Sequence, residues 1–292
     1  MNRESAATAP AIASMPEPDQ AKQEGTSSYA QILRSSAIIG GAQGIDYLIR
    51  LVRVKLVAVL LGPSGVGLVG LYLSTIDVVR TVSGLGINTS GVREIAEANG
   101  GGDAEQVART VKTLRRVCWA TGVLGWILTA ALSYPLSVWT FGSGEHVWAV
   151  ALLGASIFVG AIGGGQKALL QGIRRIGDLA WIHVLSAVIG TVVALTLYLW
   201  LGEKGIVPVI LSTAAINLGC SWWFARRLEI APVRQSLRES FQNSKRLLRL
   251  GLAFMWSGLL AALVALLTRA LIVRELGLDD NGIYQAAWGV SG

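Results

Sequence analysis

The sequence predicts an all-α polytopic membrane protein, built from one six-helix lobe and the start of a second lobe that repeats it in parallel. Three observations lead to this fold class. Hydrophobic residues make up 52% of the 292 residues and charged residues only 15%, whereas soluble domains average about 25% charged residues. The apolar runs reach the roughly 20 residues that a helix needs to cross a bilayer. Turns that contain Gly and Pro separate these runs.

The chain divides into four parts by composition. Residues 1–29 are small, polar and Pro-containing, which predicts a disordered cytoplasmic tail. Residues 30–228 hold six apolar segments and predict the first six-helix transmembrane lobe. Residues 229–249 are basic and polar and predict a cytoplasmic inter-lobe linker. Residues 250–292 predict the first one to two helices of an incomplete second lobe.

Seven segments are apolar enough to span a membrane. In chain order they cover residues 35–61, 65–91, 117–141, 147–166, 179–202, 205–225 and 250–273. The turns LLGPSG and GEKG follow the first and fifth segments, and a basic, Gly-rich loop over 99–116 precedes the third. An eighth segment starts at Ile283 but contains ten residues, about half of what a span requires.

The basic residues of the loops predict the orientation. The loops after segments two, four and six contain five, three and seven Lys or Arg residues, and the loops after segments one, three, five and seven contain none, none, one and one. Because cytoplasmic loops are enriched in Lys and Arg, this alternation predicts a cytoplasmic N-terminus. The formal net charge of +7 is explained by these loops, so we expect membrane lipids and no nucleic acid as partners.

Residues of the types that can bind metals or form disulfides are few and scattered along the chain. Cys118 and Cys220 both lie in apolar segments, and His146 and His183 are isolated. Neither set has the spacing of a disulfide framework or of a metal site. We therefore expect no metal, no cofactor and no catalytic residues.

Charged side chains inside the apolar segments are the candidate site residues. A charge at the bilayer centre costs about 2.5–3.5 kcal/mol on insertion scales, so it usually faces a polar cavity. The candidates are Arg50, Arg53, Arg80 and Arg269 for binding substrate, with Asp46 and Asp77 for ion coupling. Lys55 points away from this face and is expected to snorkel.

The distribution of these charges predicts which segments form the cavity. They fall in segments one, two and seven, whereas segments three to six carry none. We expect segments three to six to be lipid-facing scaffold, and segments one, two, seven and eight to form the cavity walls. On helical geometry Asp46, Arg50 and Arg53 share a face of about 80°, and Asp77, Thr81, Gly84 and Asn88 share a face of about 60° with Arg80 beside them.

The balance of charge indicates an anionic cargo. Arg50, Arg53 and Arg80 outnumber the two aspartates, and Arg269 has no acidic residue within its segment. The planar fork of arginine suits phosphate oxygens. A structural interpretation stays open, because Asp46–Arg50 and Asp77–Arg80 have the spacings of neutralising pairs on one helix.

A short internal sequence similarity predicts a parallel repeat. Leu61-Gly62 ends segment one and Leu276-Gly277 ends segment seven, and Gly67 and Gly282 follow five residues later. Both pairs of glycines are separated by 215 positions, the length of one six-span unit. A six-span unit returns the chain to the same side, so the second unit repeats the first in parallel. We expect these 292 residues to hold about one and a quarter units, and a complete protein to continue for roughly another 150 residues.

Three stretches resemble a known family. Residues 27–74, 84–98 (GLGINTSGVREIAEA) and 274–292 (RELGLDDNGIYQAAWGVSG) closely resemble polysaccharide biosynthesis proteins of the O-antigen flippase (Wzx-like) type. That family belongs to the multidrug/oligosaccharidyl-lipid/polysaccharide exporter superfamily. The resemblance covers about residues 28–292, and against the family the chain is expected to be C-terminally truncated, lacking most of the second lobe.

The resemblance implies a transporter and not an enzyme. It implies two six-helix lobes around a cleft, and flipping of undecaprenyl-pyrophosphate-linked oligosaccharide across the bacterial inner membrane for O-antigen and lipopolysaccharide synthesis. By analogy the pyrophosphate falls on Arg53, Arg80 and Arg269. A polysaccharide polymerase and glycosyltransferases are the implied protein partners.

Other functions stay open at this point. A drug/cation antiporter of the same superfamily would need an acidic cleft, whereas this one is net basic. A membrane polymerase or ligase would need sizeable outer loops with catalytic groups, and the predicted outer loops are very short. An inactive truncated product or a scaffold that does not transport is the remaining alternative.

Overall fold

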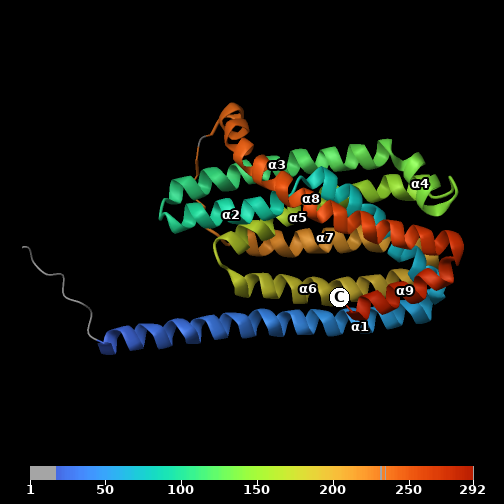
Figure 1. Ribbon diagram of the computed structural model, residues 1–292, viewed down its shortest axis with the longest axis horizontal. Helices are drawn as coiled ribbons and strands as arrows, with labels where there is room; N and C mark the ends of the chain where they lie inside the picture. The colour runs from blue at the N-terminus through green and yellow to red at the C-terminus, as the bar shows by residue number, and fades with distance from the viewer. Residues whose placement is uncertain (1–17, 231, 234, 292) are drawn as a thin grey trace, which may run out of the picture.

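The computed structural model describes residues 18–230, 232–233 and 235–291, and this part of the chain is helical without strands. The predicted all-α fold is therefore confirmed. The elements, in chain order (Figure 1), are α1 (Pro18–Gly84), α2 (Ile87–Gly100), α3 (Ala104–Ala131), α4 (Ser133–Phe141), α5 (Val147–Gly172), α6 (Ile176–Leu201), the 3₁₀ turn η1 (Gly202–Gly205), α7 (Ile206–Ala225), α8 (Leu237–Glu275) and α9 (Leu278–Ser291).

Helix α1 consists of two arms that meet at Gly62. Gly62 has φ 71° and ψ 178°, a conformation that is essentially restricted to glycine, and Pro63 follows it. We call residues 18–61 the first arm and residues 63–84 the second arm. The turn predicted after the first segment is thus confirmed. Residues 18–29, which were expected to belong to the tail, are described as helix because several of them are good helix formers continuous with the apolar arm. Residues 1–17 lie outside the described part.

Within the part of the chain that the structure describes, four helical stretches are long and apolar enough to cross a membrane, or five if α3 and α4 count as one broken span. The first stretch, Tyr47–Gly84, contains the break at Gly62, and the third, Ile176–Ala225, contains the η1 turn where GEKG was expected. The other two are Val147–Gly172 and Leu247–Glu275. Segment three does not run straight, because α3 and α4 meet at an angle of 63°.

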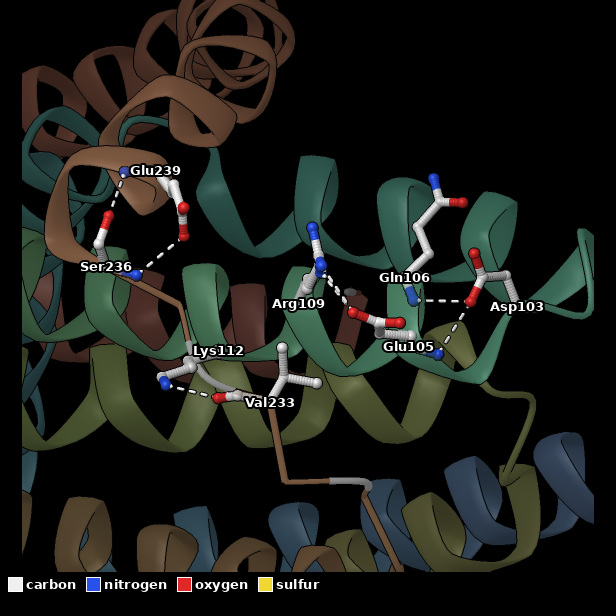
Figure 2. A network of polar contacts seen from close by, with 8 residues as sticks. All are labelled: Asp103, Glu105, Gln106, Arg109, Lys112, Val233, Ser236 and Glu239. Carbon is white, nitrogen blue, oxygen red and sulfur yellow. Dashed lines mark hydrogen bonds and ion pairs between the residues drawn. The ribbon is translucent and has the colours of Figure 1, made fainter.

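The loop expected over residues 99–116 is mostly helix. Asp103 caps α3, since its carboxylate accepts hydrogen bonds from the backbone N–H groups of Glu105 (2.9 Å) and Gln106 (3.0 Å). Arg109 then pairs with Glu105 one turn on, at 2.6 Å (Figure 2). Only residues 101–103 remain as the connection between α2 and α3.

Helix α5 corrects the expectation that segments three to six all face lipid. It packs against both α3 and α7, and its residues Val150, Leu153, Ile157 and Leu169 are at most 2% exposed. The charge-free sequence of segment four therefore reflects burial within the lobe. Lipid-facing character fits α6 better, since its Trp181 and Trp200 are exposed.

The connection between α7 and α8 is bound to α3. Lys112 Nζ donates a hydrogen bond to the Val233 carbonyl oxygen (2.8 Å), and Arg116 donates to the carbonyl oxygens of Gln235 (3.1 Å) and Ser236 (2.9 Å). A capping box between Ser236 and Glu239 starts α8 (Figure 2). The predicted linker 229–249 is thus shorter than expected, because α8 already begins at Leu237.

The predicted repeat of 215 residues reappears as reciprocal contacts between α1 and α9. A Cβ atom on Gly67 would overlap the Leu278 carbonyl oxygen, and a Cβ atom on Gly282 would overlap the Pro63 carbonyl oxygen. Residues 67 and 282 are separated by 215 positions, and so are residues 63 and 278. Contacts that are mutual in this way indicate a local twofold relation. Gly62 and Gly277, which share the same offset, both have positive φ, 71° and 104°.

Candidate binding site

The second arm of α1, helix α8 and helix α9 line an open cavity of about 440 Å³, which we call the arginine cavity. Its polar lining residues are Ser74, Asp77, Arg80, Thr81, Arg269 and Gln285. Segments two, seven and eight therefore supply walls, as expected. Segment one contributes no lining residue to this cavity among the residues that the structure describes.

Arg269 is positioned by α8 itself and by α9. Its Nε donates to Gln285 Oε1 (2.9 Å), its Nη1 donates to the Ala265 carbonyl oxygen (3.1 Å), and its guanidinium lies 5.6 Å from the centre of the Tyr284 ring. Arg269 is 6% exposed. Gln285 can approach because a glycine, Gly70, faces it: a Cβ there would lie 2.8 Å from Gln285 Oε1. These contacts hold the guanidinium in one orientation at the cavity wall.

Arg80 and Asp77 lie one turn apart on the second arm and face the same cavity. Their closest atoms are 3.9 Å apart, which is too long for a hydrogen bond, and both side chains are more than half exposed, at 59% and 63%. The charges of Arg80 and Arg269 both act on Asp77. The neutralising pair of Asp77 and Arg80 is therefore present only in a loose form.

The other sequence-predicted residues are placed differently. Arg53, on the first arm, does not line the arginine cavity. It lies near Tyr198 of α6, with which its charge interacts electrostatically. The side chains of Asp46 and Arg50 lie outside what the structure describes. The predicted roles of Arg50, Arg53 and Asp46 stay predictions.

Sequence reasoning missed a further cation, Lys167. It was assigned to the loop after segment four, but α5 continues to Gly172 and carries Lys167 within it. Its charge and that of Arg80 act on each other. The signal that could have revealed it is the uninterrupted helical sequence from Gln166 to Gln171, which contains no turn residue.

A second, smaller cavity adjoins the first. It measures about 180 Å³ and shares Arg80 and Thr81 with the arginine cavity. Its remaining polar lining comes from Ser83, Asn88, Thr89 and Thr121, so we call it the hydroxyl pocket. Asn88, predicted on the face of segment two, lies instead on α2, because α1 ends at Gly84 and Leu85 and Gly86 have positive φ.

The arrangement can bind an anion of tetrahedral geometry. Two arginines and one aspartate line the arginine cavity, which leaves an excess of positive charge. Each guanidinium presents up to five N–H donors in a planar fork that matches phosphate oxygens. The arginines come from the two repeat units, since Arg80 is in the first and Arg269 in the second.

Comparisons with known proteins agree with this architecture. A model of the family described as polysaccharide biosynthesis protein matches residues 32–291. A comparison with curated protein sequences finds no match. Solved structures match over most of the chain but at low sequence identity, which supports the shared fold alone.

Transporters are among these structures. An inward-facing multidrug resistance MATE family transporter of the MOP superfamily has a TM-score of 0.66 at 18% identity, over 86% of this chain and 60% of that one. The MATE multidrug transporter DinF-BH has a TM-score of 0.71 at 16% identity, over 89% and 60%. A MOP superfamily transporter from Pyrococcus furiosus has a TM-score of 0.61 at 20% identity, over 88% and 62%. The chain thus spans about 60% of the length of the structures that it matches.

Proposed function

Because the chain belongs to the polysaccharide biosynthesis protein family, we propose that it flips a lipid-linked oligosaccharide across the membrane, with the pyrophosphate of undecaprenyl pyrophosphate as the group that it grips. The observation that carries the proposal is the arginine cavity. There, Arg80 and Arg269 from two repeat units line one space together with a single carboxylate, that of Asp77. The setting that we propose is the bacterial inner membrane, with the N-terminus in the cytoplasm and the oligosaccharide destined for O-antigen-type polysaccharide.

The proposed mechanism is alternating access around a fixed site. Arg80 and Arg269 hold the pyrophosphate, the glycan occupies the polar cavity, and the polyprenyl tail stays in the lipid. Because the arginines belong to different repeat units, rocking of one unit against the other would separate or join them. Arg50 and Arg53 remain candidates for contacts earlier or later in the passage. A polysaccharide polymerase and glycosyltransferases are the proposed protein partners.

Asp77 is the proposed coupling residue, with Asp46 as the other candidate. Protonation of Asp77 would remove its attraction for Arg80 and Arg269 and leave both guanidinium groups to the phosphates. The variant Asp77→Asn should therefore retain pyrophosphate binding and lose the dependence of transport on a proton gradient. Transport into vesicles with and without an imposed gradient measures this, and an unchanged gradient dependence would remove the assignment.

A drug/cation antiporter is the second candidate, because several of the matched solved structures are multidrug transporters. The charge of the arginine cavity argues against it, since a cationic drug needs an acidic site. The Pyrococcus furiosus transporter is described as having a binding pocket of reverse polarity that suggests a different function. The polarity of the pocket is therefore the property on which we base the choice.

The test compares single-arginine variants in cells and in vesicles. Replacing Arg80 or Arg269 with Ala removes charge-assisted hydrogen bonds of about 1.5–3 kcal/mol. Affinity for a polyprenyl pyrophosphate should therefore fall about 10- to 100-fold. Surface polysaccharide and flipping of a lipid-linked oligosaccharide should be lost with it. The matched control is Arg274→Ala, an exposed arginine in the last turn of α8. Normal surface polysaccharide in both variants, or drug resistance conferred by the wild type without any effect on glycan, would overturn the proposal.

A further inference from the structure

The helical hairpin formed by α6 and α7 has arginines at both of its ends. Its apolar stretch is Ile176–Ala225. Arg174 and Arg175 directly precede this stretch, and Arg226 and Arg227 directly follow it. All four residues are exposed. Because arginines next to a membrane span place their charge at the membrane–water interface, these guanidinium groups are expected at the level of the lipid headgroups.

The two ends of the hairpin lie side by side. Leu170 and Phe224 belong to one buried cluster, and Ile173 and Leu228 pack against another. The last two residues directly adjoin flanking arginines in the sequence. The start of α6 and the end of α7 accordingly lie at the same end of the bundle (Figure 1). We call the surface formed there the hairpin patch, and its members are Arg174, Trp222, Trp223, Arg226 and Arg227.

The arginines of the hairpin patch have no carboxylate partner. Their neighbour Arg175 does have one, since its Nη1 lies 3.5 Å from Asp178 Oδ2. Among the residues that the structure describes, no carboxylate forms an ion pair with the three arginines of the patch, although Glu229 is close to them in the sequence. The patch therefore presents three positive charges that no described acidic side chain neutralises.

Two exposed tryptophans contact these guanidinium groups. The Cζ atom of Arg226 lies 4.1 Å from the centre of the Trp223 ring and 5.0 Å from that of the Trp222 ring, and Arg227 lies 5.4 Å from the Trp223 ring. Both tryptophans are exposed. Stacking on a ring face restrains a guanidinium group and leaves the N–H donors at its edge free for an anion. Exposed tryptophan rings at this level are typical of contact with lipid headgroups.

Arg174 has a backbone conformation that favours glycine. Its φ is 61°, in the left-handed region that costs an L residue conformational energy. The turn at the end of α5 requires this conformation, because the N–H groups of Arg174 and Arg175 donate to the carbonyl oxygens of Gln171 (3.1 Å) and Leu170 (2.8 Å). Glycine would form the same bonds without strain. A strained arginine at this position therefore points to a use for its side chain.

We propose that the hairpin patch binds the headgroup of an anionic phospholipid of the surrounding membrane. The three arginines hold the phosphate oxygens, whose geometry matches the guanidinium fork. The acyl chains lie along exposed apolar side chains of the hairpin, among them Trp181 and Val188 of α6. This apolar surface favours a lipid over a soluble anion, and three positive charges favour a lipid with two phosphates over a lipid with one.

The proposed lipid site is separate from the proposed transport site. No residue of the hairpin patch lines the arginine cavity or the hydroxyl pocket. The proposal therefore does not depend on what the chain transports, and the two can be tested independently.

The experiment titrates the full chain, purified in detergent, with three lipids and counts the bound lipids by native mass spectrometry. The probes are phosphatidylglycerol with one phosphate, diphosphatidylglycerol with two, and phosphatidylcholine as the neutral reference. The double variant Arg226→Gln, Arg227→Gln should bind both anionic lipids about 25-fold more weakly, at about fivefold for each arginine, and should bind phosphatidylcholine as the wild type does. Trp223→Leu, which removes the ring that both guanidinium groups contact, should lose about two- to fivefold.

Two further variants separate a lipid site from general effects. Arg109→Gln removes an exposed arginine that pairs with Glu105 on α3, and it should change the affinity for anionic lipid by less than about twofold. Arg174→Gly removes a patch side chain and its backbone strain together. It should therefore raise the thermal midpoint in phosphatidylcholine micelles and lower the affinity for phosphatidylglycerol about fivefold. Damage to the fold cannot produce that combination.

Two results would overturn the proposal. One is a double variant that binds phosphatidylglycerol and diphosphatidylglycerol as tightly as the wild type, or that loses no more affinity than Arg109→Gln. The other is an equal loss of affinity for a bare polyprenyl pyrophosphate, because the patch would then belong to the path of the cargo. Arg80→Ala tests the proposed function separately, and it should bind phosphatidylglycerol as the wild type does.

Discussion

The two arms of α1 carry similar charges in similar apolar surroundings, yet they meet different neighbours. Each arm has an aspartate followed within four residues by an arginine, Asp46 and Arg50 in the first and Asp77 and Arg80 in the second. The second arm packs against α9 through Gly67 and directs Asp77 and Arg80 into the arginine cavity. On the first arm, Arg53 instead lies near Tyr198 of α6, with which its charge interacts electrostatically.

This difference shows that a position in an apolar helix does not by itself place an arginine in the arginine cavity. A charged residue in an apolar helix turns toward whatever polar neighbour is near, and that neighbour can be another helix as well as a cavity. The glycines of the two arms show the same contrast. A Cβ on Gly44 of the first arm would meet nothing within 4 Å, whereas one on Gly67 or Gly70 would collide with α9.

The largest loss of stability is expected from placing a side chain at the glycine contact between the second arm and α9. Gly282→Leu would drive a side chain into the Pro63 carbonyl group. Overpacking of this kind costs about 3 kcal/mol, because the backbone must move apart. Thermal unfolding in detergent should show a large drop in midpoint. Gly44→Leu, on the first arm, should unfold close to the wild type, and equal stability of the two variants would contradict the contrast between the arms.

A smaller effect is expected at the junction of the arms. Gly62→Ala forces a side chain into the φ and ψ region that only glycine adopts readily, at a cost of about 1–3 kcal/mol. Unfolding of this variant should begin at lower temperature. Gly84→Ala is the control, since Gly84 ends the second arm and a Cβ there meets open space. A junction variant as stable as the control would mean that the kink at Gly62 is not required.

The smallest effect is expected from replacing Arg53, the arginine of the first arm, and it contrasts with the effect of replacing Arg80 on the second arm. Arg53→Ala should change the affinity for a polyprenyl pyrophosphate by less than about threefold, because Arg53 does not line the arginine cavity and distant charges are weakened by screening. The same titration on Arg80→Ala supplies the reference loss of about 10- to 100-fold. Losses of similar size in both variants would show that the first arm contributes to the site as much as the second.

Part of the candidate site could be predicted from residue types alone. Arg80, Asp77 and Arg269 were identified because a charge is costly in an apolar helix, and all three line one cavity. The partners of Arg269 could not be identified in this way. Tyr284 and Gln285 lie 15 and 16 residues away on another helix, and their contact depends on the close approach that Gly67, Gly70 and Gly282 permit.

The hydroxyl pocket was beyond sequence reasoning for a similar reason. Serine, threonine and asparagine are common in membrane helices, and no spacing distinguishes Ser83 from hydroxyls that bond to their own helix, as that of Thr121 does. Lys167 was misplaced because a basic residue near the end of an apolar run resembles a loop residue. Its position in α5 depends on how far the helix continues before Ile173.

The order of residues by itself determined the all-helical membrane fold, the turn at Gly62 and the repeat of 215 positions, because hydrophobicity, backbone restriction and periodicity are local properties of a chain. The packing of the helices decided which charges share a cavity, that α5 is buried, and that the charge of Arg53 acts on α6. These outcomes depend on contacts between residues far apart in the chain, where one missing Cβ sets how closely two backbones can approach.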